Sequence, residues 1–260
     1  MNWALRRQIL FIGVIILLFG LLGFSAIYPK LNKPPTCTDG KENGNETGID
    51  CGGSCLNACF DQTIPVTVLW SRAFKVVPGR YNAVAYIVNH NKNDAAEGVS
   101  YRFRFADANN IYIGKREGTT FIPPSGNFAI FAPTIDVGNS TPVYTTFEFT
   151  STPEWLQVSQ NKIDQLKVLT SNLELMNVDT SPELSAVIKN TSLFTIPGVS
   201  VVAILYDKLG NAISASNTYL DELNPLQTSQ INFTWPQPFG SPVVAQELIP
   251  MYDIFSVKLQ

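Results

Sequence analysis

The chain has 260 residues, enough for one large domain or two ordinary ones, and 45% of them are hydrophobic. This share, together with 15% charged residues, is typical of a globular protein and excludes a largely disordered one. The formal net charge is −3, and no run of lysine or arginine interrupts the sequence. The basic surface that nucleic-acid binding needs is therefore missing, and we expect no nucleic-acid partner.

The first expected element is a membrane helix at residues 8–28, QILFIGVIILLFGLLGFSAIY, a stretch without any charged residue. About 20 apolar residues are enough to cross the hydrocarbon core of a bilayer as a helix. Arg6 and Arg7 precede the stretch, so the positive-inside tendency predicts a cytoplasmic tail at residues 1–7 and an extracytoplasmic remainder. A cleaved signal peptide is the alternative, but its apolar part is usually shorter. We expect an uncleaved signal anchor in the cell membrane, with the lipid bilayer as a partner.

Residues 29–60 predict a stalk, in which a proline-rich spacer leads into the segment CTDGKENGNETGIDCGGSCLNAC. This segment holds all cysteines of the chain, Cys37, Cys51, Cys55 and Cys59. An even number of cysteines in a short extracytoplasmic segment predicts two disulfides, whose pairing stays open. A zinc ion on the four thiolates is the alternative. A redox pair is disfavoured because the chain has no C-x-x-C motif.

The same segment offers a candidate calcium site. Asp39, Asn43, Glu46 and Asp50 supply the oxygen ligands that calcium prefers, and interleaved glycines let the chain turn to present them. The spacing differs from that of an EF-hand loop. The alternative is that these residues only form turns in a disulfide-tied loop.

The stretch from Cys37 to Cys55 resembles the pattern C-x-D-G-x-x-N-G-x-E-T-G-x-D-C-G-G-x-C of secreted and surface proteins of microbes. The resemblance implies a location outside the cytoplasm and no particular chemistry.

From Asp61 onward the pattern predicts β-strands, for example VSYRFRFAD, in which aromatic and arginine side chains alternate. An internal repeat runs through this part: Gly98-Val99-Ser100 recurs as Gly198-Val199-Ser200, and Asp107 as Asp207. We therefore predict two tandem β-sandwich domains of the immunoglobulin or fibronectin kind, at residues 61–152 and 153–260. An eight-stranded barrel is the lesser alternative. Between the copies, Thr152 and Pro153 in STPEWLQ predict a single helical turn.

The stretch from Val201 to Trp235 resembles the FxLYD domain, an extracytoplasmic β-sandwich module of prokaryotes. The residues that carry the likeness are Leu205, Tyr206, Asp207, Gly210, Leu223, Pro225, Ile231 and Phe233. The first position of the signature departs from the family, because Ala203 stands where phenylalanine is expected. The resemblance implies a domain of membrane-anchored surface proteins and brings no enzymatic activity or ligand with it.

The sequence predicts no enzyme. Its one histidine, His90, lies in a polar stretch after an expected strand, so no Ser-His-Asp or Cys-His set can form, and no phosphate-binding loop motif occurs. The aromatic residues are expected to fill cores more often than to form an exposed platform; the ones considered are Trp70, Tyr112, Phe121, Phe128, Trp155 and Trp235. N-glycosylation sequons begin at Asn45, Asn139, Asn190 and Asn232.

These observations predict a membrane-anchored structural or adhesive protein whose two sandwiches contact a protein partner in the cell envelope. One alternative is a ligand- or carbohydrate-binding surface module. Another is an accessory subunit of an envelope secretion or pilus-like complex.

Overall fold

The computed structural model describes residues 3–31 and 35–258. Residues 1–2 of the predicted tail, residues 32–34 of the predicted spacer and residues 259–260 lie outside the described part. The chain divides into two compact units, Met1–Ser54 and Cys55–Gln260.

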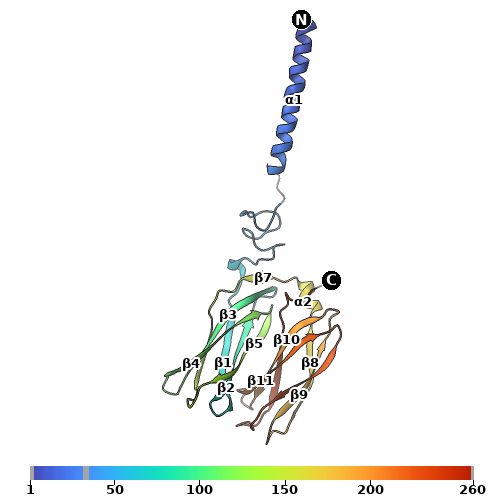
Figure 1. Cartoon of the computed structure of the whole chain (residues 1–260). Helices are drawn as coiled ribbons and strands as arrows, with labels where there is room; N and C mark the ends of the chain where they lie inside the picture. Colours follow the sequence, from blue (N-terminus) through green and yellow to red (C-terminus); the bar gives the residue numbers. More distant parts are fainter. Residues whose placement is uncertain (1–2, 32–34, 259–260) are drawn as a thin grey trace. The chain divides into compact units, whose positions relative to one another are not determined.

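The first unit begins with a long apolar helix, α1 (Trp3–Leu31, 29 residues; Figure 1). Its stretch Arg6–Ser25 has a hydropathy of 2.5 and is long and apolar enough to cross a membrane. The rest of the unit is a loop segment without regular strands among its described residues, closed by an isolated β-bridge between Gly48 and Cys51.

The second unit is built almost entirely from β-strands (Figure 1). Its first part contains η1 (Phe60–Gln62), β1 (Thr67–Val77), β2 (Arg80–Asn89), β3 (Asp94–Ala106), β4 (Tyr112–Ile122), β5 (Gly126–Asp136), β6 (Tyr144–Phe149) and β7 (Trp155–Gln157). Its second part contains α2 (Gln160–Gln165), β8 (Val168–Met176), β9 (Glu183–Asn190), β10 (Ile196–Tyr206), β11 (Ala212–Leu223), β12 (Thr228–Thr234) and β13 (Ala245–Met251).

The strands form two β-sandwiches with the same topology. The first sandwich consists of the sheets β1-β2-β5 and β4-β3-β6, with β7 added beside β3. The second consists of the sheets β8-β9-β12 and β11-β10-β13. The two strand orders correspond one to one, so the structure confirms the predicted all-β fold with tandem sandwiches. The narrower kinship with immunoglobulin or fibronectin domains stays a prediction.

The internal repeat of the sequence has a structural basis in β3 and β10. Both strands contain a glycine in the left-handed region, Gly98 with a φ of 61° and Gly198 with a φ of 60°. From there the same register runs through both strands, so that Phe103 and Phe105 fill the first core where Ala203 and Leu205 fill the second. Only glycine adopts such a backbone without strain, which accounts for the recurring glycine of Gly-Val-Ser.

A buried asparagine ends the second strand of each sandwich. Asn190 is fully buried, and its Nδ2 donates to the carbonyl oxygens of Phe194, Leu223 and Asn224 at 2.8–3.0 Å. Asn89, 1% exposed, donates to the carbonyls of Asp94 and Pro123 in the same way. Each asparagine ties two loops together. Because Asn190 is buried, the folded protein cannot present this sequon for glycosylation.

The structure corrects the prediction for STPEWLQ. Trp155 to Gln157 form the strand β7, which pairs with β3 of the first sandwich, beyond the predicted boundary at residue 152. The Trp155 side chain is 7% exposed, so burial of its ring in the first sandwich outweighs the helix-start signal of Thr152 and Pro153. The helical turn comes later, as α2, where Ser159 accepts a bond from the Lys162 amide.

The two sandwiches pack sheet against sheet within the second unit. The sheet β1-β2-β5 of the first sandwich lies against the sheet β11-β10-β13 of the second, and one apolar cluster runs through both. The order of layers is therefore β4-β3-β6, β1-β2-β5, β11-β10-β13 and β8-β9-β12. Figure 1 shows β4 and β3 on one side of this stack and β8 and β9 on the other.

Candidate functional site

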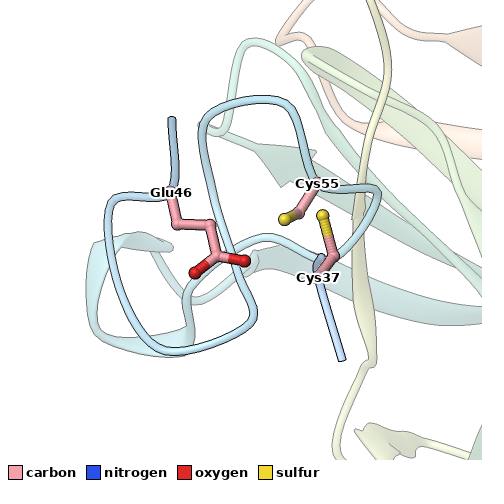
Figure 2. Close-up of side chains that lie close together, drawn as sticks. All are labelled: Cys37, Glu46 and Cys55. Atoms are coloured by element: carbon pink, nitrogen blue, oxygen red, sulfur yellow. The ribbon is translucent and has the colours of Figure 1, made fainter. Parts of the chain in front are cut away.

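The four cysteines, Cys37, Cys51, Cys55 and Cys59, are all disulfide-bonded, so the two disulfides that the sequence predicts are present. Figure 2 shows the cluster of Cys37, Glu46 and Cys55, whose sulfurs and carboxylate oxygen lie within 4.8 Å of one another. In residues 3–31 and 35–258 this is the one group of three or more potential metal ligands. Zinc binds thiolates, and a disulfide sulfur is not a thiolate, so the zinc alternative is excluded for this oxidised form.

The candidate calcium residues form one hydrogen-bonded network. The Asp50 carboxylate accepts bonds from the backbone amides of Asp39 and Gly40, at 2.9–3.1 Å. Asp39 in turn accepts bonds from Asn43 Nδ2 at 3.0 and 3.3 Å, and Glu46 Oε2 accepts one from the Asn43 amide at 3.0 Å. The bond from Asn43 lowers the pKa of Asp39 below its usual value, although desolvation of the exposed carboxylate by its neighbours acts in the opposite direction.

These bonds give the acidic side chains a structural role, since each carboxylate fastens the loop by accepting donors from the backbone or from Asn43. The carboxylates of Asp39 and Asp50 belong to no cluster of three ligand groups among the described residues. A bound calcium ion stays a prediction.

One glycine of the segment, Gly53, is required by close packing. Gly53 has a φ of +60°, and a Cβ built on it would lie 1.5 Å from the Asn45 carbonyl oxygen. No other residue fits there without moving the backbone. The second glycine of the motif C-G-G-x-C is thus required by the loop's path.

The chain beyond Cys55 is fixed to the first sandwich. The Ala58 amide donates to the Trp155 carbonyl at 2.9 Å, and the Gln157 amide donates to the Leu56 carbonyl at 2.6 Å. Together with the bridge between Asn57 and Leu156, these bonds extend the sheet at β7 by a short segment. The end of the predicted stalk is therefore part of the β-structure.

The interface between the sandwiches, called the inter-sandwich interface below, is mostly apolar. Val84 on β2 and Val202 and Ile204 on β10 are each at most 1% exposed. Trp70 stacks on Tyr86 with ring centroids 5.4 Å apart. An interface of this kind holds two domains as one body.

A carboxylate clamp lies in this interface. Glu247 on β13 accepts a hydrogen bond from Tyr86 on its Oε1 and one from Tyr206 on its Oε2, both at 2.7 Å. Burial first, and then the bond to Glu247 and its charge, raise the pKa of Tyr86 to about 12. The same causes raise the pKa of Tyr206. Tyr206 is the signature tyrosine of the FxLYD resemblance, so the structure gives this residue a packing role.

The signature aspartate also has a structural role. Asp207 Oδ1 accepts bonds from the amides of Leu209 at 2.8 Å and Asn211 at 2.9 Å, and Asp107 Oδ1 does the same for Asn109 and Ile111 at 2.9 Å. Both aspartates shape the turn between the third and fourth strands of their sandwich. Membership in the FxLYD family itself stays a prediction.

The aromatic residues considered from sequence separate into two groups. Phe128, Trp155 and Trp235 are buried in cores, and Trp70 and Phe121 are half-buried. Tyr112 is 60% exposed, and sequence reasoning missed its counterpart Tyr144, which is 52% exposed. The alternation of side chains in β6, YTTFEF, could have revealed it. Phe147 and Phe149 face the core, so Tyr144, an odd number of positions away from both, faces outward.

No protein-family model and no curated protein matches the chain. Among solved structures, a red sea bream transglutaminase aligns with 72% of this chain and 29% of its own length, at 9% identity and a TM-score of 0.23. A β-glucuronidase of glycoside hydrolase family 2 aligns with 68% of this chain and 24% of its own length, at 8% identity and a TM-score of 0.23. The chain thus spans less than a third of either protein, and likeness at this level says nothing about its activity.

Proposed function

We propose that the chain is a single-pass membrane-anchored protein whose β-sandwiches lie outside the cytoplasm and contact a protein partner in the cell envelope. One observation carries this proposal: a helix with an apolar stretch of hydropathy 2.5 precedes a segment whose cysteines are all disulfide-bonded. Disulfides persist in oxidising compartments, and the helix is long enough for a bilayer. Arg6 and Arg7 at the start of the helix favour a cytoplasmic N-terminal end.

The packing of the second unit supports a structural or adhesive role. The inter-sandwich interface and its Glu247 clamp join the sandwiches into one body, and the bonds at Leu56 and Ala58 fix the incoming chain to that body. A rigid body holds a contact surface in a defined orientation, which lowers the entropic cost of binding a partner.

The proposed role is binding rather than catalysis. His90, the one histidine of the chain, is exposed in the loop after β2. Asp221 and Glu222, an acidic pair, are neighbours on β11 and exposed, and side chains of neighbouring strand residues point to opposite faces. Neither feature offers a nucleophile with an oriented base.

Topology is tested by adding one epitope tag before Met1 and another after Gln260 in intact native cells. We expect the second tag to react with antibody in intact cells and the first only after the membrane is opened. Alkaline extraction should leave the protein in the membrane. Release by alkali, or a second tag that stays hidden in intact cells, contradicts the anchor.

The partner is tested by extracting the native protein in mild detergent and measuring its size by chromatography with light scattering. A stoichiometric second protein that stays with the chain through two purification steps is expected. A homogeneous monomer without a second protein contradicts the proposed contact, and also an accessory role in an envelope complex.

A further inference from the structure

The outer face of the sheet β4-β3-β6 carries two exposed tyrosines in one cross-strand row. Ala106 on β3 pairs with Tyr112 on β4 and with Tyr144 on β6. Residues that pair directly across strands share a face of the sheet, so the two tyrosines flank a small alanine. Their side chains stand about 10 Å apart, since two strand spacings separate them. This surface, with the rows below, is called the tyrosine face.

The next two rows of the tyrosine face are charged. Arg104 pairs with Lys115 on one side and with Thr146 on the other, which places two cations beside the tyrosines. In the following row, Arg102 forms ion pairs with Glu117 at 2.6 Å and Glu148 at 3.3 Å.

The two cations of the second row, Arg104 and Lys115, are exposed and can exchange their present carboxylate partners for others. Arg104 Nη2 lies 3.1 Å from Glu148 Oε1, and Lys115 Nζ lies 2.9 Å from Glu117 Oε2, with side chains 52% and 51% exposed for Arg104 and Lys115. Exposed ion pairs of this kind are weak in water, so the carboxylates of an anionic ligand can take the place of Glu148 and Glu117 at little cost.

The second sandwich shows what the equivalent face looks like when it docks on protein. In its corresponding row, Tyr206 pairs with Ala212 and Ala245, and the next outward residues of β10 are Ile204 and Val202. This aliphatic face is buried against the first sandwich. The tyrosine face has the opposite arrangement, because two tyrosines flank an alanine where the second sandwich has two alanines flanking a tyrosine. It also carries Arg104 and Arg102 in place of the aliphatic residues. The tyrosine face therefore lacks the apolar centre through which two sheets pack against each other.

We propose that the tyrosine face binds an acidic polysaccharide, a chain of sugar rings that bear carboxylates. Tyr112 and Tyr144 offer aromatic faces and hydroxyls to two non-adjacent sugars of a chain laid across the strands, because sugar rings present C–H groups that pack on aromatic rings. Arg104 and Lys115 lie in the row beside that chain and hold its carboxylates, the arginine through its planar pair of N–H donors. The site lies entirely within the first sandwich and does not depend on the membrane topology or on a protein partner.

The test is calorimetric binding of oligogalacturonate to the full-length protein in detergent. We expect binding that weakens as salt rises. The double variant Tyr112→Ala with Tyr144→Ala, which copies the alanines of the second sandwich, should bind about tenfold more weakly or not at all. The double variant Arg104→Gln with Lys115→Gln should bind about as weakly as the double tyrosine variant, and its binding should no longer depend on salt.

The control is Thr228→Ala with Gln230→Ala on the outward side of β12, which should bind like the unaltered protein. The proposal is overturned if oligogalacturonate does not bind, if a neutral cello-oligosaccharide binds equally, or if the double variants bind like the control. Polyglutamate binding as tightly as the glycan also overturns it and assigns the face to an acidic protein. Since binding is measured in detergent, its failure leaves the membrane anchor and the protein partner standing.

Discussion

The hydroxyl of Tyr86 in the first sandwich donates a hydrogen bond to Oε1 of Glu247 in the second, at 2.7 Å. Tyr86 is 8% exposed, and its ring also stacks on Trp70 within the inter-sandwich interface. The second oxygen of Glu247 is held by Tyr206 at 2.7 Å. The one carboxylate therefore joins strands of both sandwiches inside a mostly apolar contact, which Arg72 also crosses by donating to the Ala212 carbonyl at 3.0 Å.

Replacing Glu247 with alanine should destabilise the protein. Two half-buried tyrosine hydroxyls would lose their acceptor, and each buried group left without a partner costs about 1–3 kcal/mol. Urea unfolding of the full-length protein in detergent measures the loss. The control Glu174→Ala, at an exposed position on β8, should change the free energy of unfolding by less than about 0.5 kcal/mol. Equal losses in both variants would show that the clamp contributes nothing.

Alkaline pH should weaken the folded protein through the same tyrosines. The pKa of Tyr86 rises from 10.0 to about 12 on folding, which means that the folded state favours the neutral phenol. This stabilising contribution is complete below pH 10 and is lost as the pH rises towards 12. The pKa of Tyr252, raised to about 12 by burial, acts in the same direction.

The measurement is the free energy of unfolding at a series of pH values from about 9 to about 11, the range in which tyrosine begins to titrate. The variant Tyr86→Phe should lose less stability over this range than the unaltered protein does. An identical pH dependence in both proteins would rule out Tyr86 as a contributor.

The stacked arrangement of the sandwiches predicts the effect of a single charge. Val202→Arg copies the residue that the first sandwich has at the equivalent position, Arg102, and would place an unpaired charge in the inter-sandwich interface. We expect the two sandwiches to separate while each keeps its own core. Small-angle scattering should show a larger radius of gyration, and protease should cleave the chain between Val158 and Lys167. Val187→Arg on β9, whose side chain lies on the outward side of the stack, is the matched control and should leave both readouts unchanged.

Most of the fold could be predicted from strand periodicity. In YRFRFA the aromatic side chains alternate with arginines, and Phe103 and Phe105 are indeed buried while Arg104 is exposed. The stacking of the sandwiches was missed, although a signal existed. VVAILY, the equivalent stretch Val201–Tyr206, is apolar at every position, which is typical of a strand buried on both faces.

The contacts of the candidate sites could be predicted less well. The clamp joins Tyr86 to Glu247 over 161 residues, and no periodicity in the sequence relates the two positions. In the cysteine segment the residue types indicated oxygen ligands, but the loop's path decides which donors they meet. Asp50 meets the amides of Asp39 and Gly40, a contact that the spacing of the acidic residues does not reveal.

The path of that loop predicts a strict requirement for glycine at position 53. A Cβ at Gly53 would lie 1.5 Å from the Asn45 oxygen and 2.6 Å from its carbonyl carbon, both backbone atoms that cannot turn aside. Gly53→Ala should therefore displace the loop that brings the cysteines together. The expected result is a lower yield of correctly paired disulfides, measured by peptide mapping without reduction.

Gly40→Ala is the matched control, because Gly40 also has a positive φ, +72°, but nothing lies within 4 Å of its Cβ position. It should lose about 1–2 kcal/mol from backbone strain and keep its disulfides. The same yield in both variants would show that backbone conformation, and not the close approach to Asn45, is what demands glycine here.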